Sequence, residues 1–289
     1  MKFGYYANRG SLSYSKIKAN TVKAEKLGFD SVHIHDHFMM QNGSFLEAGM
    51  VAAALAVETQ KIKVGHLVLC NSFRNPALLA KMISTLDNIS NGRALMWLGA
   101  GWYKREYLGY GYPFPSPKVR VDQLEESLTI YKKAFTEKEF SFEGQFWNLK
   151  RMKNYPRPIQ KPYPQIVLGS NGKRMTDIAC READGINMPS LKVTQIPQRV
   201  PYILDKLKKY NRNPDDFEIS VWNDVTLVKN QEEIELRRPD QLEKEFIGFP
   251  EDIKERIAEI EDAGVKRMVI SFGESQLEDQ LTVFGKKVM

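Results

Sequence analysis

The chain has 289 residues, of which 42% are hydrophobic and 27% charged, a balance that suits one α/β barrel with a real core and excludes a disordered protein. Its net charge of +6 is dispersed among acidic residues, so we expect no nucleic-acid partner, although mild basicity suits an acidic small molecule. Two distant cysteines, Cys70 and Cys180, exclude a disulfide framework, and the sequence has neither a signal-peptide core nor a membrane span, so we expect a cytoplasmic protein.

Along the chain, helical stretches end at a glycine, and an apolar, strand-like run follows within a few residues. Glycine is the usual residue just past a helix end because it adopts the left-handed conformation without a Cβ clash. This pattern occurs at Gly28, Gly92, Gly185 and Gly264. It predicts that helices and strands alternate, as in an α/β protein.

The predicted helices carry apolar residues with the 3.6-residue period of a helix that buries one face, as in residues 79–86, 121–135 and 200–207. The predicted strands are continuous apolar runs, as in residues 64–69, which is typical of parallel strands covered by helices on both faces. About eight strand candidates favour a closed (β/α)₈ TIM barrel over an open doubly wound sheet. We expect one such domain over residues 1–289.

Two short insertions interrupt the alternation of helix and strand. Residues 139–157 carry closely spaced aromatic side chains around Gly144 and are predicted to form a short β-hairpin before a proline-rich stretch. Residues 229–248 are highly charged and are predicted to form an exposed insertion between the seventh strand and its helix. Neither segment has the composition of a linker to a second domain.

Polar or glycine-rich segments follow the second to fifth predicted strands, where a barrel carries its active site. The clearest is the loop after the fifth strand, formed by Gly169, Ser170, Asn171, Gly172 and Lys173. Its glycines permit close backbone approach and a helix begins immediately afterwards, so its N–H groups, with Lys173 and Arg174, are suited to cradle a phosphate. The alternative, a simple helix-capping loop, remains equally open.

Three histidines alternate along the second predicted strand, at His33, His35 and His37. Alternate residues share one face of a strand, so such a group suggests a metal site, but the only other histidine is His66 and no later strand end carries a convincing carboxylate ligand. We predict no metal site and expect His33 and His35 to be buried or hydrogen-bonded in the barrel. His37, beside Asp36 at the strand end, is a candidate acid/base or cofactor contact.

The segment after the fourth strand contains Gly99 and Gly101, followed by Trp102 and Tyr103. It lacks the third glycine of a dinucleotide-binding fingerprint and lies far from the first strand, which excludes a Rossmann site. The two aromatic side chains either cap the barrel or form the wall of a site for a flat heterocycle, for which the glycines make room. Both interpretations remain open.

Taken together, these segments resemble the luciferase-like monooxygenase superfamily, and within it the branch that depends on the deazaflavin coenzyme F420. The similarity runs almost from end to end and is weakest over residues 192–249. The matching motifs are residues 24–32, 36–38, 71–81, 98–103, 109–114 and 183–185.

The resemblance implies a TIM barrel with the cofactor lying across its C-terminal mouth. It implies that Asp36 contacts the deazaflavin headgroup and that loop 169–173 holds the phosphate. It also implies a non-proline cis peptide bond at Leu67–Val68, whose bulge lies behind the ring.

Further roles follow from the same resemblance. Asn71, Gly101 and Trp102 stand in matching motifs and are expected to contact the cofactor, and His37 and Glu106 are candidates for proton transfer at the substrate. One departure concerns the second strand. Where relatives commonly carry Trp or Tyr and then Gly or Pro before the Asp-His pair, this chain has His33 and His35, which we expect to place extra imidazoles near the substrate pocket.

The leading functional hypothesis is therefore an F420-dependent oxidoreductase that transfers a hydride between the deazaflavin and a small organic substrate. The alternative is a monooxygenase that uses reduced FMN and oxygen, whose phosphate suits the same loop. More remote alternatives are a metal-dependent TIM-barrel hydrolase and a non-catalytic flavin carrier. Relatives suggest a homodimer, whereas the substrate and the direction of the reaction do not follow from the sequence.

Overall fold

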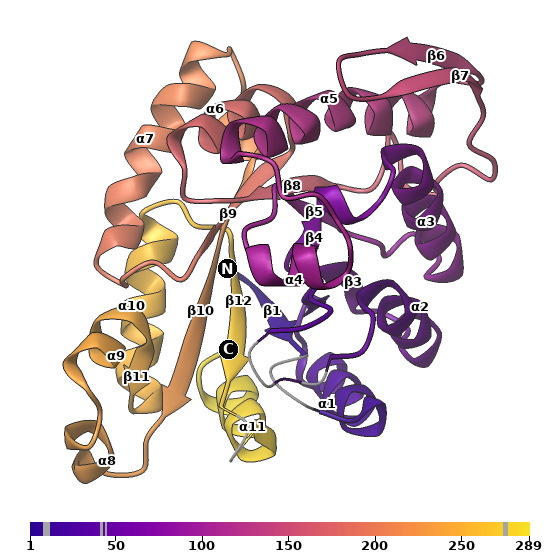
Figure 1. Ribbon diagram of the computed structural model, residues 1–289. Coiled ribbons are helices and arrows are strands. Elements are labelled where there is room, and N and C mark those ends of the chain that lie inside the picture. Colours follow the sequence, from indigo (N-terminus) through magenta and orange to yellow (C-terminus); the bar gives the residue numbers. More distant parts are fainter. Residues whose placement is uncertain (8–11, 41–42, 44, 274–276) are drawn as a thin grey trace.

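The computed structural model describes residues 1–7, 12–40, 43, 45–273 and 277–289. Within this part of the chain, short buried strands alternate with helices (Figure 1). The strands of the main sheet are β1 (Lys2–Tyr6), β2 (Ser31–Ile34), β3 (Lys63–His66), β4 (Leu69–Cys70), β5 (Met96–Gly99), β8 (Ile166–Gly169), β9 (Gly185–Pro189), β10 (Glu218–Leu227), β11 (Phe246–Gly248) and β12 (Arg267–Phe272).

The main sheet closes into a barrel. Its strands pair in parallel in the order β3–β2–β1–β12–β10–β9–β8–β5–β4. Because β3 and β4 are two halves of one segment, the first and last strands of this order join, and a bridge between Val64 and Ala94 ties β3 to the segment before β5. Between the halves lies the cis peptide bond Leu67–Val68, as expected. The prediction of a (β/α)₈ barrel is confirmed.

Helices surround this barrel, each following a strand (Figure 1). Their apolar faces pack on the outer side of the strands and form the larger of the hydrophobic clusters. The covering helices are α1 (Tyr14–Leu27), α2 (Ala48–Glu58), α3 (Pro76–Ile89), α5 (Pro117–Thr136), α6 (Lys173–Glu182), α7 (Gln195–Lys209), α10 (Pro250–Asp262) and α11 (Leu277–Lys287). No helix of the described residues combines the length and apolar character that a bilayer span requires.

The barrel interior has its own smaller cluster, built by side chains that point inward. Tyr6, Trp97 and Val269 belong to it, with Val68 and Trp222 packed against them. Successive residues of a strand face opposite sides, so Trp97 lies inside while its neighbour Leu98 packs against the helices. This inner cluster forms the floor on which a site at the barrel mouth rests.

Both predicted insertions are present. Strands β6 (Phe140–Glu143) and β7 (Asn148–Met152) form an antiparallel hairpin beside α5, as expected (Figure 1). The charged segment 229–248 lies between β10 and α10 and contains α8 (Gln231–Glu235) and α9 (Pro239–Lys244). Its last three residues differ from the prediction, because β11 is buried and pairs with β10.

The glycine pattern was right at three of its four positions. Gly28, Gly92 and Gly264 have positive φ angles of 94°, 80° and 108° just beyond a helix. Gly185 is instead the first residue of β9, and α6 ends at Glu182. A Cβ at Gly185 would lie 2.5 Å from the carbonyl oxygen of Glu218, so close strand approach, and not a left-handed turn, requires glycine there.

Candidate functional site

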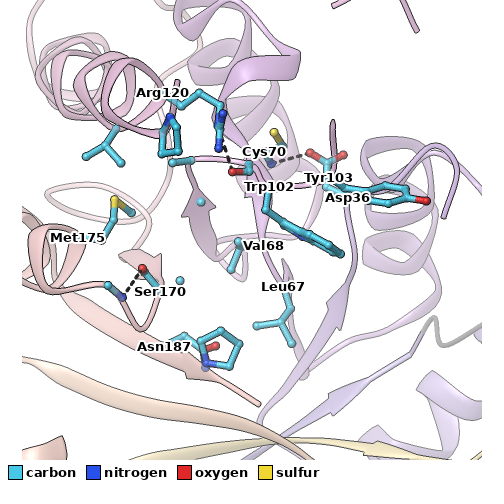
Figure 2. Close-up of a pocket in the computed structure, with 18 of the residues that line it drawn as sticks. Asp36, Leu67, Val68, Cys70, Trp102, Tyr103, Arg120, Ser170, Met175 and Asn187 are labelled. Atoms are coloured by element: carbon cyan, nitrogen blue, oxygen red, sulfur yellow. Dashed lines mark hydrogen bonds between the residues drawn. The ribbon is translucent and has the colours of Figure 1, made fainter. Parts of the chain in front are cut away.

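A cavity of about 620 Å³ opens at the C-terminal ends of the barrel strands (Figure 2). This volume lies in the range of small-molecule and cofactor sites. Loops that are distant in sequence meet there because parallel strands end at the same rim. The predicted residues that line it are Asp36, His37, Leu67, Val68, Gly101, Trp102, Glu106, Gly169, Ser170, Gly172 and Lys173.

Two predicted cofactor contacts, Asn71 and Asn171, do not line the cavity. Asn71 is buried, where its amide donates to the Ser127 hydroxyl at 3.2 Å and accepts from the Tyr131 hydroxyl at 2.7 Å. Asn171 is exposed and donates to the carbonyl oxygen of Pro189 at 2.8 Å. The first asparagine ties the β4 end to α5, and the second ties the β8 loop to β9.

His37 and Glu106 form a hydrogen-bonded pair on one side of the cavity. Nδ1 of His37 donates to Oε2 of Glu106 at 2.9 Å, because a carboxylate can only accept. The other carboxylate oxygen accepts the N–H groups of Phe38 and of Met39, the latter at 2.8 Å, so the carboxylate is fixed and its side chain is 1% exposed. In the neutral imidazole this leaves the Nε2 lone pair free to take a proton.

Asp36 lines the cavity, but its carboxylate already has partners. Arg74 donates to both of its oxygens, at 2.6 Å and 2.9 Å, and the backbone N–H of Cys70 donates at 2.8 Å. The Asp36–Cys70 contact is drawn in Figure 2. The carboxylate therefore fixes the end of β2 against β4 and lies behind the cavity wall.

His33 and His35 are buried, as predicted. His33 is hydrogen-bonded to the Ser31 hydroxyl at 3.0 Å, and His35 to the Tyr6 hydroxyl at 2.8 Å. Burial lowers the pKa of both imidazoles to about 3, with the charge of His37 adding to the effect at His35. Neither residue lines the cavity, although His35 lies next to the lining residues Tyr6 and His37.

The bulge at Leu67–Val68 forms the centre of the cavity floor, between Ser170 on one side and Trp102 on the other (Figure 2). Val68 has room because two neighbours are glycines. A Cβ at Gly99 would lie 2.7 Å from a Val68 methyl group, and one at Gly169 would lie 2.8 Å from the other. Glycine is also required at position 101, because a Cβ there would lie 1.7 Å from the Tyr107 hydroxyl oxygen.

The glycine pair after the fourth strand thus makes room for protein side chains. Of the two interpretations of Trp102, the structure supports the wall, because its side chain is 65% exposed and borders the cavity instead of packing in the core. Its ring stands nearly perpendicular to that of His37, with centroids 5.9 Å apart.

The opposite end of the cavity is suited to an anion. Helix α6 begins there without a side-chain cap, so its first N–H groups lack side-chain acceptors, and Ser170 accepts the N–H of Gly172 at 2.9 Å. Arg120 of α5 also lines the cavity and is only 6% exposed. Its contacts in the described part of the chain are the carbonyls of Gly101 and Pro115 and the ring of Phe114, with no carboxylate.

Of the two basic residues predicted to support the phosphate, Lys173 and Arg174, the arginine already has carboxylate partners. The guanidinium of Arg174 pairs with Asp122 and, at 3.2 Å, with Glu125, which ties α6 to α5. The sequence suggested loop 169–173, supported by Lys173 and Arg174, as the phosphate site and did not single out Arg120. A signal was present, because Arg120 lies four residues before Leu124 on the apolar face of α5, where a charged side chain is unusual.

Other lining residues missed from the sequence are Cys70, Tyr107, Asn187 and Trp222. Burial raises the pKa of the Cys70 thiol to about 11, and its sulfur lies 3.0 Å from the Tyr107 hydroxyl. Within the described part, the buried Asn187 Oδ1 and Trp222 Nε1 have no hydrogen-bond partner, so both are available to a ligand. No sequence motif marks either residue.

The described residues contain no cluster of three or more His, Cys, Asp or Glu side chains able to hold a metal ion.

The chain matches a family model described as luciferase-like monooxygenase over residues 1–242. An F420-dependent glucose-6-phosphate dehydrogenase of Intrasporangium calvum is 30% identical over 226 residues, which cover 75% of this chain and 67% of the relative.

Two further similarities extend this comparison. An FMNH(2)-dependent dimethylsulfone monooxygenase of Pseudomonas putida is 30% identical over 199 residues, covering 64% of this chain and 54% of the relative. A solved F420-dependent secondary alcohol dehydrogenase shares the fold with a TM-score of 0.87 at 18% identity, covering 99% of this chain and 98% of that one.

Proposed function

The chain belongs to the luciferase-like monooxygenase family, and from this premise we propose that it is an oxidoreductase that binds coenzyme F420 and exchanges hydrogen with a small organic substrate. The observation that carries the proposal is one cavity with an anion site at one end and an oriented acid/base pair at the other. The similarity to an F420-dependent dehydrogenase supports this cofactor.

The residues present fit such a cofactor. Arg120 is a buried guanidinium whose described contacts are two carbonyls and a ring, and a phosphate would supply the negative charge that it lacks. The start of α6 adds backbone N–H groups to the same site, and Ser170 and Lys173 border it. We assign the cofactor's phosphate to this end, with its ring over Leu67 and Val68.

At the other end, His37 moves the proton. The bound cofactor supplies a ring carbon that accepts or releases a hydrogen together with two electrons. His37 Nε2 takes the proton of a substrate hydroxyl, or returns it to a carbonyl oxygen in the reverse direction. Glu106 holds the imidazole by Nδ1 and stabilises its positive charge while the proton is bound. Trp102 covers this pair and restricts access of water.

The alternative is an FMN-dependent monooxygenase, which the similarity to the dimethylsulfone enzyme favours. The anion site would hold the FMN phosphate equally well, so the ring system decides between the two. An open cavity disfavours a non-catalytic carrier. The buried free thiols Cys70 and Cys180 fit the cytoplasmic location that we propose.

The proposal is tested by titrating the protein with F420 and with FMN while following fluorescence quenching. We expect F420 to bind at least about tenfold more tightly than FMN. Arg120→Met removes a charged phosphate contact worth about 1.5–3 kcal/mol, so it is expected to weaken binding roughly 10- to 100-fold. The phosphate-free deazaflavin riboside should bind both proteins alike.

The matched control is Arg151→Met on the β6–β7 hairpin, which should leave the affinity unchanged. Ser170→Ala should weaken binding less than Arg120→Met, because the backbone N–H groups remain. Tighter binding of FMN would favour the monooxygenase. If neither compound bound, the family resemblance would describe the fold alone.

We also propose that the protein is a homodimer through the outer faces of α2 and α3. Met50 and Val57 on α2 are 71% and 68% exposed, and Leu78 on α3 is 54% exposed. The two helices are neighbours on one side of the barrel (Figure 1). Large apolar side chains gathered on neighbouring helices are typical of a protein interface.

A further inference from the structure

Four of the aromatic rings that line the cavity are those of Tyr6, His37, Trp102 and Trp222, and we call this group the aromatic wall. The Tyr6 and Trp222 ring centroids lie 5.5 Å apart, and those of His37 and Trp102 lie 5.9 Å apart. His35 joins the two pairs, because it is hydrogen-bonded to the Tyr6 hydroxyl and its ring lies 5.6 Å from that of His37. Elements distant in the sequence thus bring these rings, which are inclined to one another, to one largely apolar side of the cavity.

The cationic side chains come from elements outside this wall, and Arg120 reaches the backbone beside it, at the carbonyl oxygen of Gly101. Among the described residues, the Lys and Arg side chains that line the cavity are Arg120, Lys173 and Arg174, all on α5 and α6. The proposed function assigns this end to the cofactor's phosphate. Behind His37, by contrast, lies the Glu106 carboxylate. A second phosphate against the aromatic wall would face a negative charge in a half-enclosed site, which is unfavourable.

We propose that the substrate held by the aromatic wall is an uncharged molecule with an apolar body and one reacting hydroxyl or carbonyl oxygen, in contrast to the sugar phosphate named for the relative from Intrasporangium calvum. This inference rests on the proposed function. The apolar body packs on Tyr6 and Trp222, and the oxygen faces His37. Oxidation of such an alcohol to a carbonyl removes a hydrogen with two electrons from carbon to the oxidised cofactor and a proton from oxygen to His37.

Two polar atoms in the cavity refine this description. Trp222 Nε1 is a buried donor and Asn187 Oδ1 a buried acceptor, each without a partner among the described residues. Asn187 of β9 pairs with Ser220 of β10, two residues before Trp222, so it lies deeper in the barrel than Trp222. The wall is therefore able to accommodate one further polar group, whereas several hydroxyl groups would be left without partners on the rings.

The test uses the full chain loaded with F420. Reduction of the cofactor by cyclohexanol is compared with reduction by glucose 6-phosphate, and oxidation of the reduced cofactor by cyclohexanone is measured in parallel. We expect kcat/KM for the cyclohexyl pair to exceed that for glucose 6-phosphate by at least about tenfold, a difference of about 1.4 kcal/mol. A preference for glucose 6-phosphate overturns the inference. So does the absence of turnover with both cyclohexyl compounds when the cofactor binds.

Variants separate this inference from the proposed function. Trp222→Ala should raise KM for cyclohexanol about tenfold while the Kd for F420 stays within about twofold, and Trp222→Phe should restore most of the loss because it restores apolar area. Leu236→Ala, at an exposed position just after α8, is the matched control. A wild-type protein that binds no F420 would refute the proposed function. If Trp222→Ala binds the cofactor and its KM for cyclohexanol is unchanged, the proposal that the aromatic wall binds the substrate would be refuted.

Discussion

Three histidines are held neutral by the barrel, and this burial has a consequence for stability. Burial lowers the pKa of His33 and His35 to about 3 and that of His66 to about 4, from 6.5 in the unfolded chain. Below pH 6.5 the unfolded chain therefore binds protons that the folded barrel cannot. The contribution to stability is complete above pH 6.5 and is lost as the pH falls toward these lower values.

We predict that the free energy of unfolding falls between pH 7 and pH 5, by roughly 1–2 kcal/mol for each buried imidazole. The measurement is urea unfolding followed by circular dichroism at both pH values. His33→Gln, which can keep a hydrogen bond to Ser31, should reduce the difference between the two pH values even if it lowers stability at both. If the free energy of unfolding changed by the same amount between pH 7 and pH 5 in wild type, His33→Gln and His66→Gln, the effect would come from carboxylates instead.

At the scale of elements, the cavity floor depends on how closely three strands approach. Val68 lies between Gly99 of β5 and Gly169 of β8, and a Cβ at either glycine would overlap one of its methyl groups. Packed interiors have no free space of this size, so an added methyl group must displace a neighbour. The floor is thus set jointly by the β3–β4 segment and the two strands that follow it in the barrel.

Gly169→Ala is predicted to destabilise the protein by about 1–3 kcal/mol and to weaken F420 binding, because Val68 must leave its place in the floor. A Cβ at position 169 lies 3.6 Å from the Cβ of residue 68, an ordinary contact, so the conflict involves only the Val68 methyl groups. Once Val68→Ala has removed these methyl groups, adding Gly169→Ala should cost little further stability. Thermal unfolding and cofactor titration measure the two effects. Gly273→Ala, whose Cβ would meet no atom of the described residues within 4 Å, is the control. If Gly169→Ala unfolded at the wild-type temperature, Val68 would be able to move at no cost in stability, which would contradict the prediction.

The same elements explain what the sequence could predict. Buried parallel strands are short, continuous apolar runs, so the barrel followed from local pattern, and rim residues such as His37 and Ser170 followed from their place just after a strand. Asn187 and Trp222 lie inside strands, where no local pattern distinguishes a ligand contact from a core position, whereas Arg120 is marked by its charge on the apolar face of α5. The pairing of His37 with Glu106, 69 residues apart, depends on the closed barrel itself. The resemblance suggested both residues but not their contact.

For the whole molecule, the proposed dimer concerns the helices that support the site. Helix α2 follows β2 and the residues Asp36 and His37 just after it, and α3 follows the segment with the Leu67–Val68 bulge. The two helices pack against each other, and their exposed apolar side chains extend along one side of the barrel. A partner on this side would support the half of the site that carries the acid/base pair, so dissociation is expected to lower cofactor affinity as well as mass.

We predict that the protein sediments at twice its chain mass of 33.2 kDa and that Met50→Glu with Val57→Glu converts it to the monomer. Two carboxylates placed in a dry apolar interface cost several kcal/mol, which is enough to dissociate a dimer of standard interface size at micromolar concentration. Analytical ultracentrifugation gives the mass. Leu236→Glu, at a similarly exposed position just after α8 on the other side of the barrel, is the matched control (Figure 1). A wild-type mass of one chain, or equal dissociation by the control, would contradict an interface on α2 and α3. If the double variant is monomeric and binds F420 as tightly as wild type, the dimer stabilises the fold without supporting the site.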